Sequence, residues 1–105
     1  MNCIRYIGQV VNSKKHGNGM LFVDNCIFDG MFKNDMLEGF GKMHYDNGET
    51  YEGDWYENRK NGYGTYRWSN GDIYEGAYRN DKRHGYGRMC KGLISKKKDN
   101  NKSVK

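Results

Sequence analysis

The chain has 105 residues, of which 35% are hydrophobic and 14% aromatic, and it contains 15 glycines and no proline. A chain of this length forms one small domain, and such a domain buries too little surface to enclose a deep catalytic cavity. The formal net charge is +5, but residues 1–91 are nearly neutral, so the basic charge belongs mainly to residues 92–105.

Taken in chain order, the sequence repeats itself four times. Each copy opens with an aromatic residue two positions before a glycine, and successive copies begin 22 or 23 residues apart. A Gly-x-Gly step starts nine residues after that first glycine in every copy. The opening pairs are Tyr6-Gly8, Phe28-Gly30, Tyr51-Gly53 and Tyr74-Gly76, and the steps are Gly17/Gly19, Gly39/Gly41, Gly62/Gly64 and Gly85/Gly87. Two features in phase predict four repeats, at residues 6–27, 28–50, 51–73 and 74–91, within an ordered domain over residues 1–91.

Each copy is predicted to form a β-hairpin, because rings and glycines recur with period two. In the third copy one face of the hairpin is predicted to carry Tyr51, Gly53, Trp55, Gly62, Gly64, Tyr66 and Trp68. The repeated glycines, with Tyr51, Tyr66 and Tyr74, have a structural role in this interpretation, since a ring can lie across a neighbouring backbone that has no Cβ. Stacked hairpins then bury rings that one hairpin alone cannot bury.

The reversals of the chain are predicted from residues that favour turns. Ser13, Asp35, Asn58 and Asp81 take the tight position inside the four hairpins. Asn-Gly pairs at residues 47–48 and 70–71 lie between hairpins and suit a two-residue reversal.

The carboxyl end differs from the repeats. Residues 92–105, GLISKKKDNNKSVK, have too few apolar side chains to offset the entropy of ordering, and we predict a disordered basic tail. No stretch approaches the roughly 18 apolar residues of a membrane span, and the amino end does not have the pattern of a signal peptide. We expect a soluble, intracellular protein.

The stretch YEGDWYENRKNGYGTYRWSNGD closely resembles the membrane occupation and recognition nexus repeat, or MORN repeat. The shared features are the Tyr-x-Gly opening, Trp55, the basic pair before Gly-x-Gly-x-Tyr and the Asn-Gly-Asp close. The other copies depart from the pattern at Val10, where an aromatic is expected, at Cys26, and at Met36-Leu37, which replace the basic pair. The resemblance implies an all-β fold, an elongated single-layer antiparallel sheet of tandem β-hairpins. It also implies a role in scaffolding, dimerisation or attachment, in the cytoplasm near a membrane or the cytoskeleton.

No set of residues is predicted to converge on an enzyme, metal or cofactor site. His16 and His84 occupy equivalent places three repeats apart, about 30 Å in a sheet, and the three cysteines lack metal-binding spacing. The Gly-x-Gly steps lack the further glycine and the helix of a dinucleotide loop. The rings could instead form a platform on which nucleic-acid bases stack. We favour core packing, because the glycines opposite the rings account for them without a ligand. We expect no catalysis, no cofactor and no nucleic-acid partner.

Charge is the remaining functional signal. Acidic residues lie in the links between hairpins, whereas three basic pairs lie in the loops inside hairpins, at Lys14-Lys15, Arg59-Lys60 and Lys82-Arg83. The sheet is therefore predicted to have one basic and one acidic margin. Ordinary solubility is the plainer explanation of such charges, and contact with an anionic surface is the functional one.

Three functions stay open at this point. The leading hypothesis is a module that binds a protein partner or a second copy of itself, through unpaired edges and exposed rings such as Trp55 and Trp68. The rival is a peripheral binder of acidic phospholipids, phosphoinositides included, that uses the basic pairs with Lys96, Lys97 and Lys98. The third is a repeat segment related to larger phosphatidylinositol phosphate kinases, without their catalytic domain.

Overall fold

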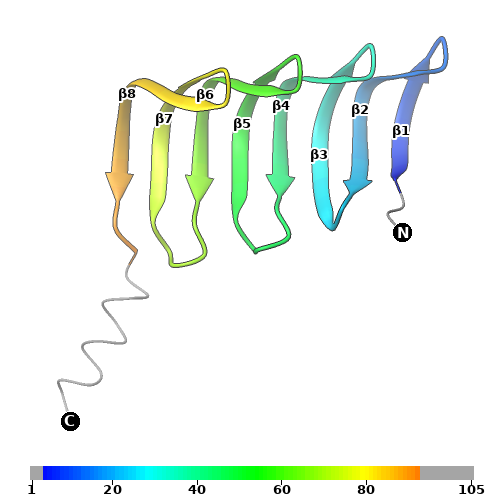
Figure 1. Ribbon diagram of the computed structural model, residues 1–105. Coiled ribbons are helices and arrows are strands. Elements are labelled where there is room, and N and C mark those ends of the chain that lie inside the picture. The colour runs from blue at the N-terminus through cyan, green and yellow to red at the C-terminus, as the bar shows by residue number, and fades with distance from the viewer. Residues whose placement is uncertain (1–3, 93–105) are drawn as a thin grey trace.

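The computed structural model describes residues 4–92 as eight strands in one antiparallel sheet, in which every strand pairs with the next one along the chain (Figure 1). The strands are β1 (Arg5–Val11), β2 (Lys14–Val23), β3 (Cys26–Lys33), β4 (Met36–His44), β5 (Thr50–Tyr56), β6 (Arg59–Arg67), β7 (Ile73–Arg79) and β8 (Lys82–Cys90). The predicted all-β, single-layer antiparallel fold is confirmed.

The predicted disordered tail lies outside the described residues from position 93 onward. Gly92, which we had assigned to that tail, is described and belongs with the sheet. It is buried, and its N–H donates a hydrogen bond of 2.7 Å to the carboxylate of Asp72.

Two-residue turns close the four hairpins at the upper margin in Figure 1. Both residues of each turn have positive φ, which is the requirement of a type I′ turn. The turns are Asn12-Ser13, Asn34-Asp35, Glu57-Asn58 and Asn80-Asp81. Apart from Ser13 and Glu57, these residues are asparagine or aspartate, which enter the left-handed region at low cost. We call this side of the sheet the tip margin.

The predicted two-residue reversal at the Asn-Gly pairs is wrong. Between β4 and β5 the Gly48 N–H donates to the Tyr45 carbonyl at 3.1 Å, and the Tyr45 N–H donates to the Glu49 carbonyl at 2.9 Å. Gly48 has a φ of +89°, whereas Asn47 stays at negative φ. The link is therefore a three-residue loop, a turn followed by a glycine in the left-handed region. The same bonds recur around Gly71.

The link between β2 and β3 lacks glycine and is the shorter one. Asp24 and Asn25 have φ of 50° and 65° and form a two-residue turn. This missing residue explains why the first repeat is 22 residues long and the later ones 23.

Eight glycines, one from each strand, form a continuous row across the sheet. Each faces the glycine of the next strand in register, in the order Gly8, Gly19, Gly30, Gly41, Gly53, Gly64, Gly76 and Gly87. A Cβ added at Gly19, Gly41, Gly64 or Gly87 would overlap the ring of Tyr6, Phe28, Tyr51 or Tyr74. The glycine row is therefore the floor on which these rings lie.

The rings form the core of the protein on one face of the sheet, which we call the ring face. They follow one another in the order Tyr6, Phe32, Phe28, Trp55, Tyr51, Tyr78 and Tyr74. Successive centroids lie 5.1 to 5.4 Å apart, with interplanar angles of 82 to 90°. This edge-to-face geometry is favourable for aromatic rings. Tyr51, in the middle of the series, has no exposed surface.

The first glycine of each Gly-x-Gly step does not share the ring face, contrary to our prediction for Gly62. The pairing of β5 with β6 shifts register between Gly53 and Trp55, as it does at the same place in every hairpin. Gly62 has a φ of +116°, and a Cβ there would lie 2.6 Å from the Asp54 carboxylate on the opposite face. A bulge, which period-two counting does not anticipate, is the cause.

Candidate functional site

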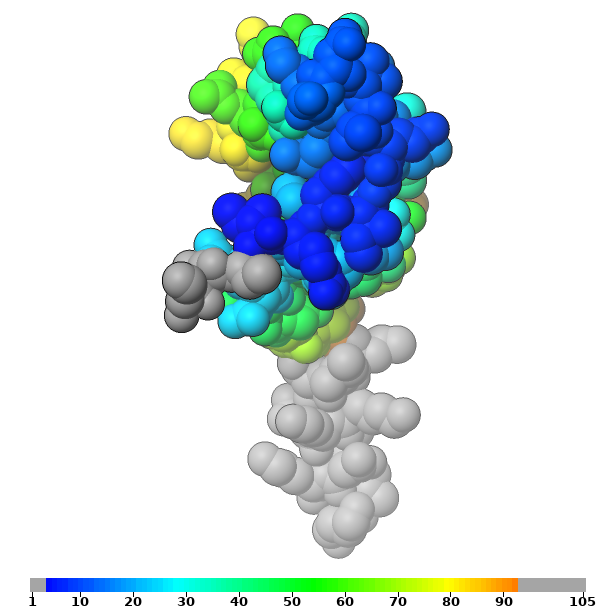
Figure 2. Space-filling view, turned by 90° about the vertical axis from the view of Figure 1, so that its right-hand side faces the viewer, coloured from blue at the N-terminus to red at the C-terminus, as the bar shows by residue number. Residues whose placement is uncertain are grey.

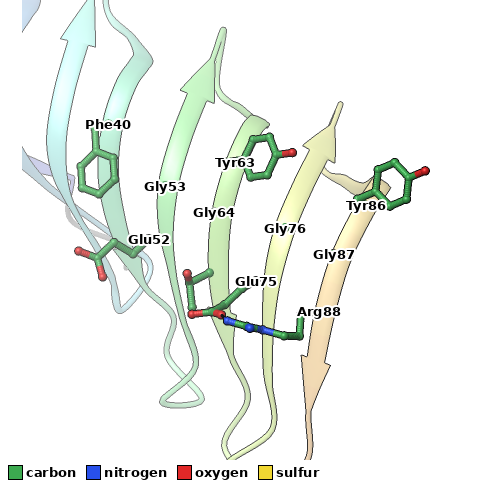
Figure 3. A pocket seen from close by; sticks show the side chains of 11 residues that line it. Phe40, Glu52, Gly53, Tyr63, Gly64, Glu75, Gly76, Tyr86, Gly87 and Arg88 are labelled. Carbon is green, nitrogen blue, oxygen red and sulfur yellow. Dashed lines mark hydrogen bonds and ion pairs between the residues drawn. The ribbon is translucent and has the colours of Figure 1, made fainter.

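A row of exposed rings lies on the face opposite the ring face, which we call the back face. The middle residue of each Gly-x-Gly step points there, and it is aromatic in three copies, as Phe40, Tyr63 and Tyr86 (Figure 3). These side chains are 55%, 66% and 90% exposed. They come from alternate strands, β4, β6 and β8, so two strand spacings of about 4.8 Å separate neighbours. Aligned exposed rings make this row a candidate interaction surface.

A groove of about 630 Å³ runs below these rings. Its floor is the backbone of Gly53, Gly64, Gly76 and Gly87, which lack side chains, and its other wall carries Glu52, Glu75 and Arg88 (Figure 3). Thr65 also lines the groove. Arg88 donates a hydrogen bond of 2.7 Å to Glu75. This contact raises the pKa of the Arg88 guanidinium. The groove thus combines rings, a flat backbone floor and carboxylates.

The bulge holds the Tyr63 ring in place on the back face. The Tyr63 N–H donates a hydrogen bond of 2.9 Å to the carboxylate of Asp54 on β5. At the equivalent place in the first hairpin, the Asn18 N–H donates to Gln9 Oε1 at 2.7 Å. In the first and third hairpins, a side chain of the odd-numbered strand therefore accepts the hydrogen bond of the backbone N–H at the bulge.

The basic pairs divide their side chains between two environments. Lys14, Arg59 and Lys82, the first members, are exposed at the tip margin. The second members lie over rings instead. The Lys15 ammonium is 5.7 Å from the Tyr6 centroid, Lys60 lies 5.5 to 5.9 Å from three rings, and the Arg83 guanidinium is 5.7 Å from the rings of Tyr74 and Trp68. These distances allow cation–π attraction.

The tip margin is mixed in charge rather than purely basic. The Lys15 ammonium lies 3.4 Å from the Asp35 carboxylate, and the Lys60 ammonium lies 3.7 Å from Asp81. A backbone hydrogen bond from Lys15 is the main cause that lowers the pKa of Asp35. The prediction of one basic margin overlooked these carboxylates, which sit in the turns of the next hairpin along.

The two tryptophans are not the exposed anchors that we proposed. Trp55 is 5% exposed, belongs to the core, and donates its indole N–H to the Gly41 carbonyl at 3.1 Å. Trp68 is half-buried beside Tyr66, with ring centroids 4.9 Å apart. Their repeat positions fall on the ring face, where neighbouring hairpins cover them.

Tyr51 and Tyr74 lie in the core, and Tyr66 packs against it. The Tyr66 hydroxyl donates a hydrogen bond of 2.8 Å to Glu49, and burial raises its pKa. Cys26 and Cys90 carry free thiols. Lys96, Lys97 and Lys98 lie outside the described residues.

Within residues 4–92, no group of three or more His, Cys, Asp and Glu side chains is arranged to hold a metal ion. A search of the same residues for a helix long and apolar enough to cross a membrane also found none.

The rings of Phe40, Tyr63 and Tyr86 were missed by the sequence analysis. The signal was present, because each is the middle residue of a Gly-x-Gly step and alternation places it opposite the glycine that a ring covers. The prediction used the two glycines of each step and not the residue between them.

Comparison with known families gives a match over most of the chain. The model of the MORN repeat matches residues 6–27, 28–50, 51–73 and 74–91. Each matched segment begins in an odd-numbered strand, and the first three also include the link to the next hairpin. None of the curated proteins that were compared matches the chain.

Proposed function

Because the chain belongs to the MORN repeat family of generally non-catalytic repeat modules, we propose that it binds a protein partner through the groove on its back face. The row formed by Phe40, Tyr63 and Tyr86 is the observation that carries this proposal. Aromatic residues dominate the binding energy of protein interfaces, and truncation of one such ring commonly costs 2 kcal/mol or more.

The chemistry of the groove favours a polypeptide over an anionic ligand. Tyrosine and phenylalanine offer a large contact area with only two side-chain torsions to fix, so little entropy is lost on binding. Arg88 already pairs with Glu75 on the opposite wall, so Glu52 is the carboxylate there that repels phosphate and attracts basic side chains. A segment that carries apolar and basic residues fits both walls. We place this binding in the cytoplasm, beside a membrane or the cytoskeleton.

Site-specific photo-cross-linking tests the location of the partner. The full chain is prepared with benzoylphenylalanine at Tyr63, in the groove, or at Tyr56, which is 49% exposed but does not line the groove. Both variants are irradiated in an extract of the native cells. We expect one discrete adduct from position 63 and none from position 56. Adducts of equal yield from both positions would contradict the proposal.

A lipid surface is the second candidate, because Lys14, Arg59 and Lys82 recur along one margin with their side chains exposed. A basic residue near an anionic leaflet contributes on the order of 1 kcal/mol. Flotation of the full chain with phosphatidylserine and phosphoinositide vesicles tests this function. Lipid would be favoured over protein as the ligand if the natural chain floats with these vesicles, if salt reverses that binding, and if the Lys14→Ser/Arg59→Ser/Lys82→Ser variant does not bind them.

A further inference from the structure

Consecutive hairpins are joined at the tip margin by a contact that repeats. The second turn residue of each later hairpin exchanges two hydrogen bonds with the backbone of the hairpin before it. Asp35 donates its N–H to the Lys15 carbonyl at 2.9 Å and accepts the Lys15 N–H on its carboxylate at 2.8 Å. Asn58 makes the same pair of bonds with Leu37, and Asp81 makes it with Lys60.

A ring contact accompanies each of these junctions. Phe32, Trp55 and Tyr78 pack edge-on against the opening ring of the preceding hairpin, with centroids 5.2, 5.4 and 5.1 Å apart. A junction therefore has an inserting half, made of a turn residue and a ring, and a receiving half, made of a backbone position and an opening ring.

The open edge of β8 carries a receiving half. Arg83 is the equivalent of Lys15, Leu37 and Lys60, and its guanidinium lies 5.7 Å from the opening ring, Tyr74. Arg83 pairs with Tyr78 in the same register as Lys60 pairs with Trp55. The N–H and carbonyl of Arg83 therefore point to the outer edge of β8, as those of Lys60 point to the next hairpin. Every residue of β8 is exposed. No turn residue from the described part of the chain sits there.

The open edge of β1 carries an inserting half. Figure 2, seen from this end, shows β1 uncovered at the front. The turn Asn12-Ser13 has φ of 52° and 64°, close to the 50° and 71° of Asn80-Asp81. Ser13 stands where later hairpins have Asp35, Asn58 or Asp81, and its hydroxyl accepts hydrogen bonds as they do. Val10 stands at the place of the inserting ring and is 61% exposed.

We propose that the β1 edge of one copy pairs antiparallel with the β8 edge of a second copy, so that the sheet continues from chain to chain. The junction of β6 with β7 supplies the register, since Gly64 faces Gly76 and Gly62 faces Tyr78. The equivalent pairs are Gly87 with Gly8, and Gly85 with Val10, of the second copy. The two surfaces differ, so the contact is heterologous and gives open chains instead of closed dimers. This pairing uses the outer backbone edge of β8, whereas the groove of the proposed function lies on the back face; the two surfaces meet at β8, since Gly87 belongs to both.

The natural contact is weaker than an internal junction, because Ser13 lacks a carboxylate and Val10 lacks a ring. Restoring them gives a gain-of-function test. In sedimentation velocity over a concentration series, we expect the full-length Val10→Trp/Ser13→Asp variant to associate at least tenfold more tightly than the natural chain, and to grow beyond a dimer. Arg83→Pro should remove the part of the gain that Ser13→Asp supplies, because it deletes the backbone N–H that the new carboxylate at position 13 would accept. Proline is tolerated on an edge strand where the N–H faces outward.

The coupling between positions 13 and 83 is the decisive part of the test. Position 13 follows β1 and position 83 lies on β8, at opposite ends of the sheet. Seven strand spacings, about 34 Å, separate these strands, so no contact inside one chain links the two positions. Val11→Trp is the matched control, because it adds the same ring at the neighbouring position. The proposal is overturned if Val10→Trp/Ser13→Asp sediments like the natural chain, if growth stops at a dimer, if Arg83→Pro leaves the gain intact, or if Val11→Trp promotes association equally.

Discussion

Replacing Gly64 by alanine should destabilise the protein strongly although it adds only one methyl group. A Cβ at Gly64 would overlap the ring of Tyr51. That ring cannot move aside, because Trp55 and Tyr78 hold it edge-on at 5.1 Å each and its hydroxyl donates to the Asp54 carbonyl at 3.0 Å.

The magnitude follows from these contacts. Overpacking costs about 1–3 kcal/mol, and disturbing the Tyr51 hydrogen bond adds about 1 kcal/mol. The higher strand propensity of alanine offsets about 0.5–1 kcal/mol. The net loss is about 1–3.5 kcal/mol, and at about 4–8 °C per kcal/mol for a domain of this size the midpoint should fall by about 4–28 °C.

Thermal unfolding followed by circular dichroism measures the effect. Thr65→Val is the matched control, since it changes the next residue of β6 on the back face, and its free energy of unfolding should change by less than about 0.5 kcal/mol. Equal midpoint shifts for the two variants would refute the assignment of the faces.

Two pH dependences follow from the hydrogen bonds and burial. Burial raises the pKa of Tyr45 and of Tyr78 to about 12, from 10.0. The stability that these neutral hydroxyls contribute is therefore complete below pH 10 and is lost as the pH rises from 10 to about 12. Phenolate absorbance and circular dichroism should change together over this range. The hydrogen bond from Tyr66 is the main cause that lowers the pKa of Glu49 below 4.5; its stabilisation is present above pH 4.5 and is lost as the pH falls further. Glu49→Gln should therefore weaken the acid dependence of the melting midpoint, and an unchanged acid slope would contradict this.

The repeat architecture could be predicted from the sequence because two independent features keep phase. The aromatic-x-Gly opening and the Gly-x-Gly step recur together, and a ring above a residue without Cβ explains both, as Tyr51 and Gly64 do in the structure. Alternation assigns Trp55 and Gly53 to one face, because the extra residues of the bulge lie on β6 and not on β5 between these two.

The site was harder to predict, because it depends on strand pairing and on contacts between neighbouring hairpins. The bulge that turns Gly62 to the back face adds residues that period-two counting cannot place. Burial of Trp55 results from contacts with rings of the preceding and same hairpins. Alternation alone places Phe40 opposite Gly41 and so on the back face, but its exposure there depends on the sheet being a single layer.

The central claim, binding of a protein through the back-face rings, is tested most directly by calorimetric titration of the purified partner found by cross-linking. The natural chain, the Phe40→Ala/Tyr63→Ala/Tyr86→Ala variant and a Tyr56→Ala control are compared, with folding checked for each. At about 2 kcal/mol for each ring in a hot spot, the triple variant should bind at least about 100-fold more weakly, while the control keeps the natural dissociation constant. An unchanged dissociation constant for the folded triple variant would contradict the account.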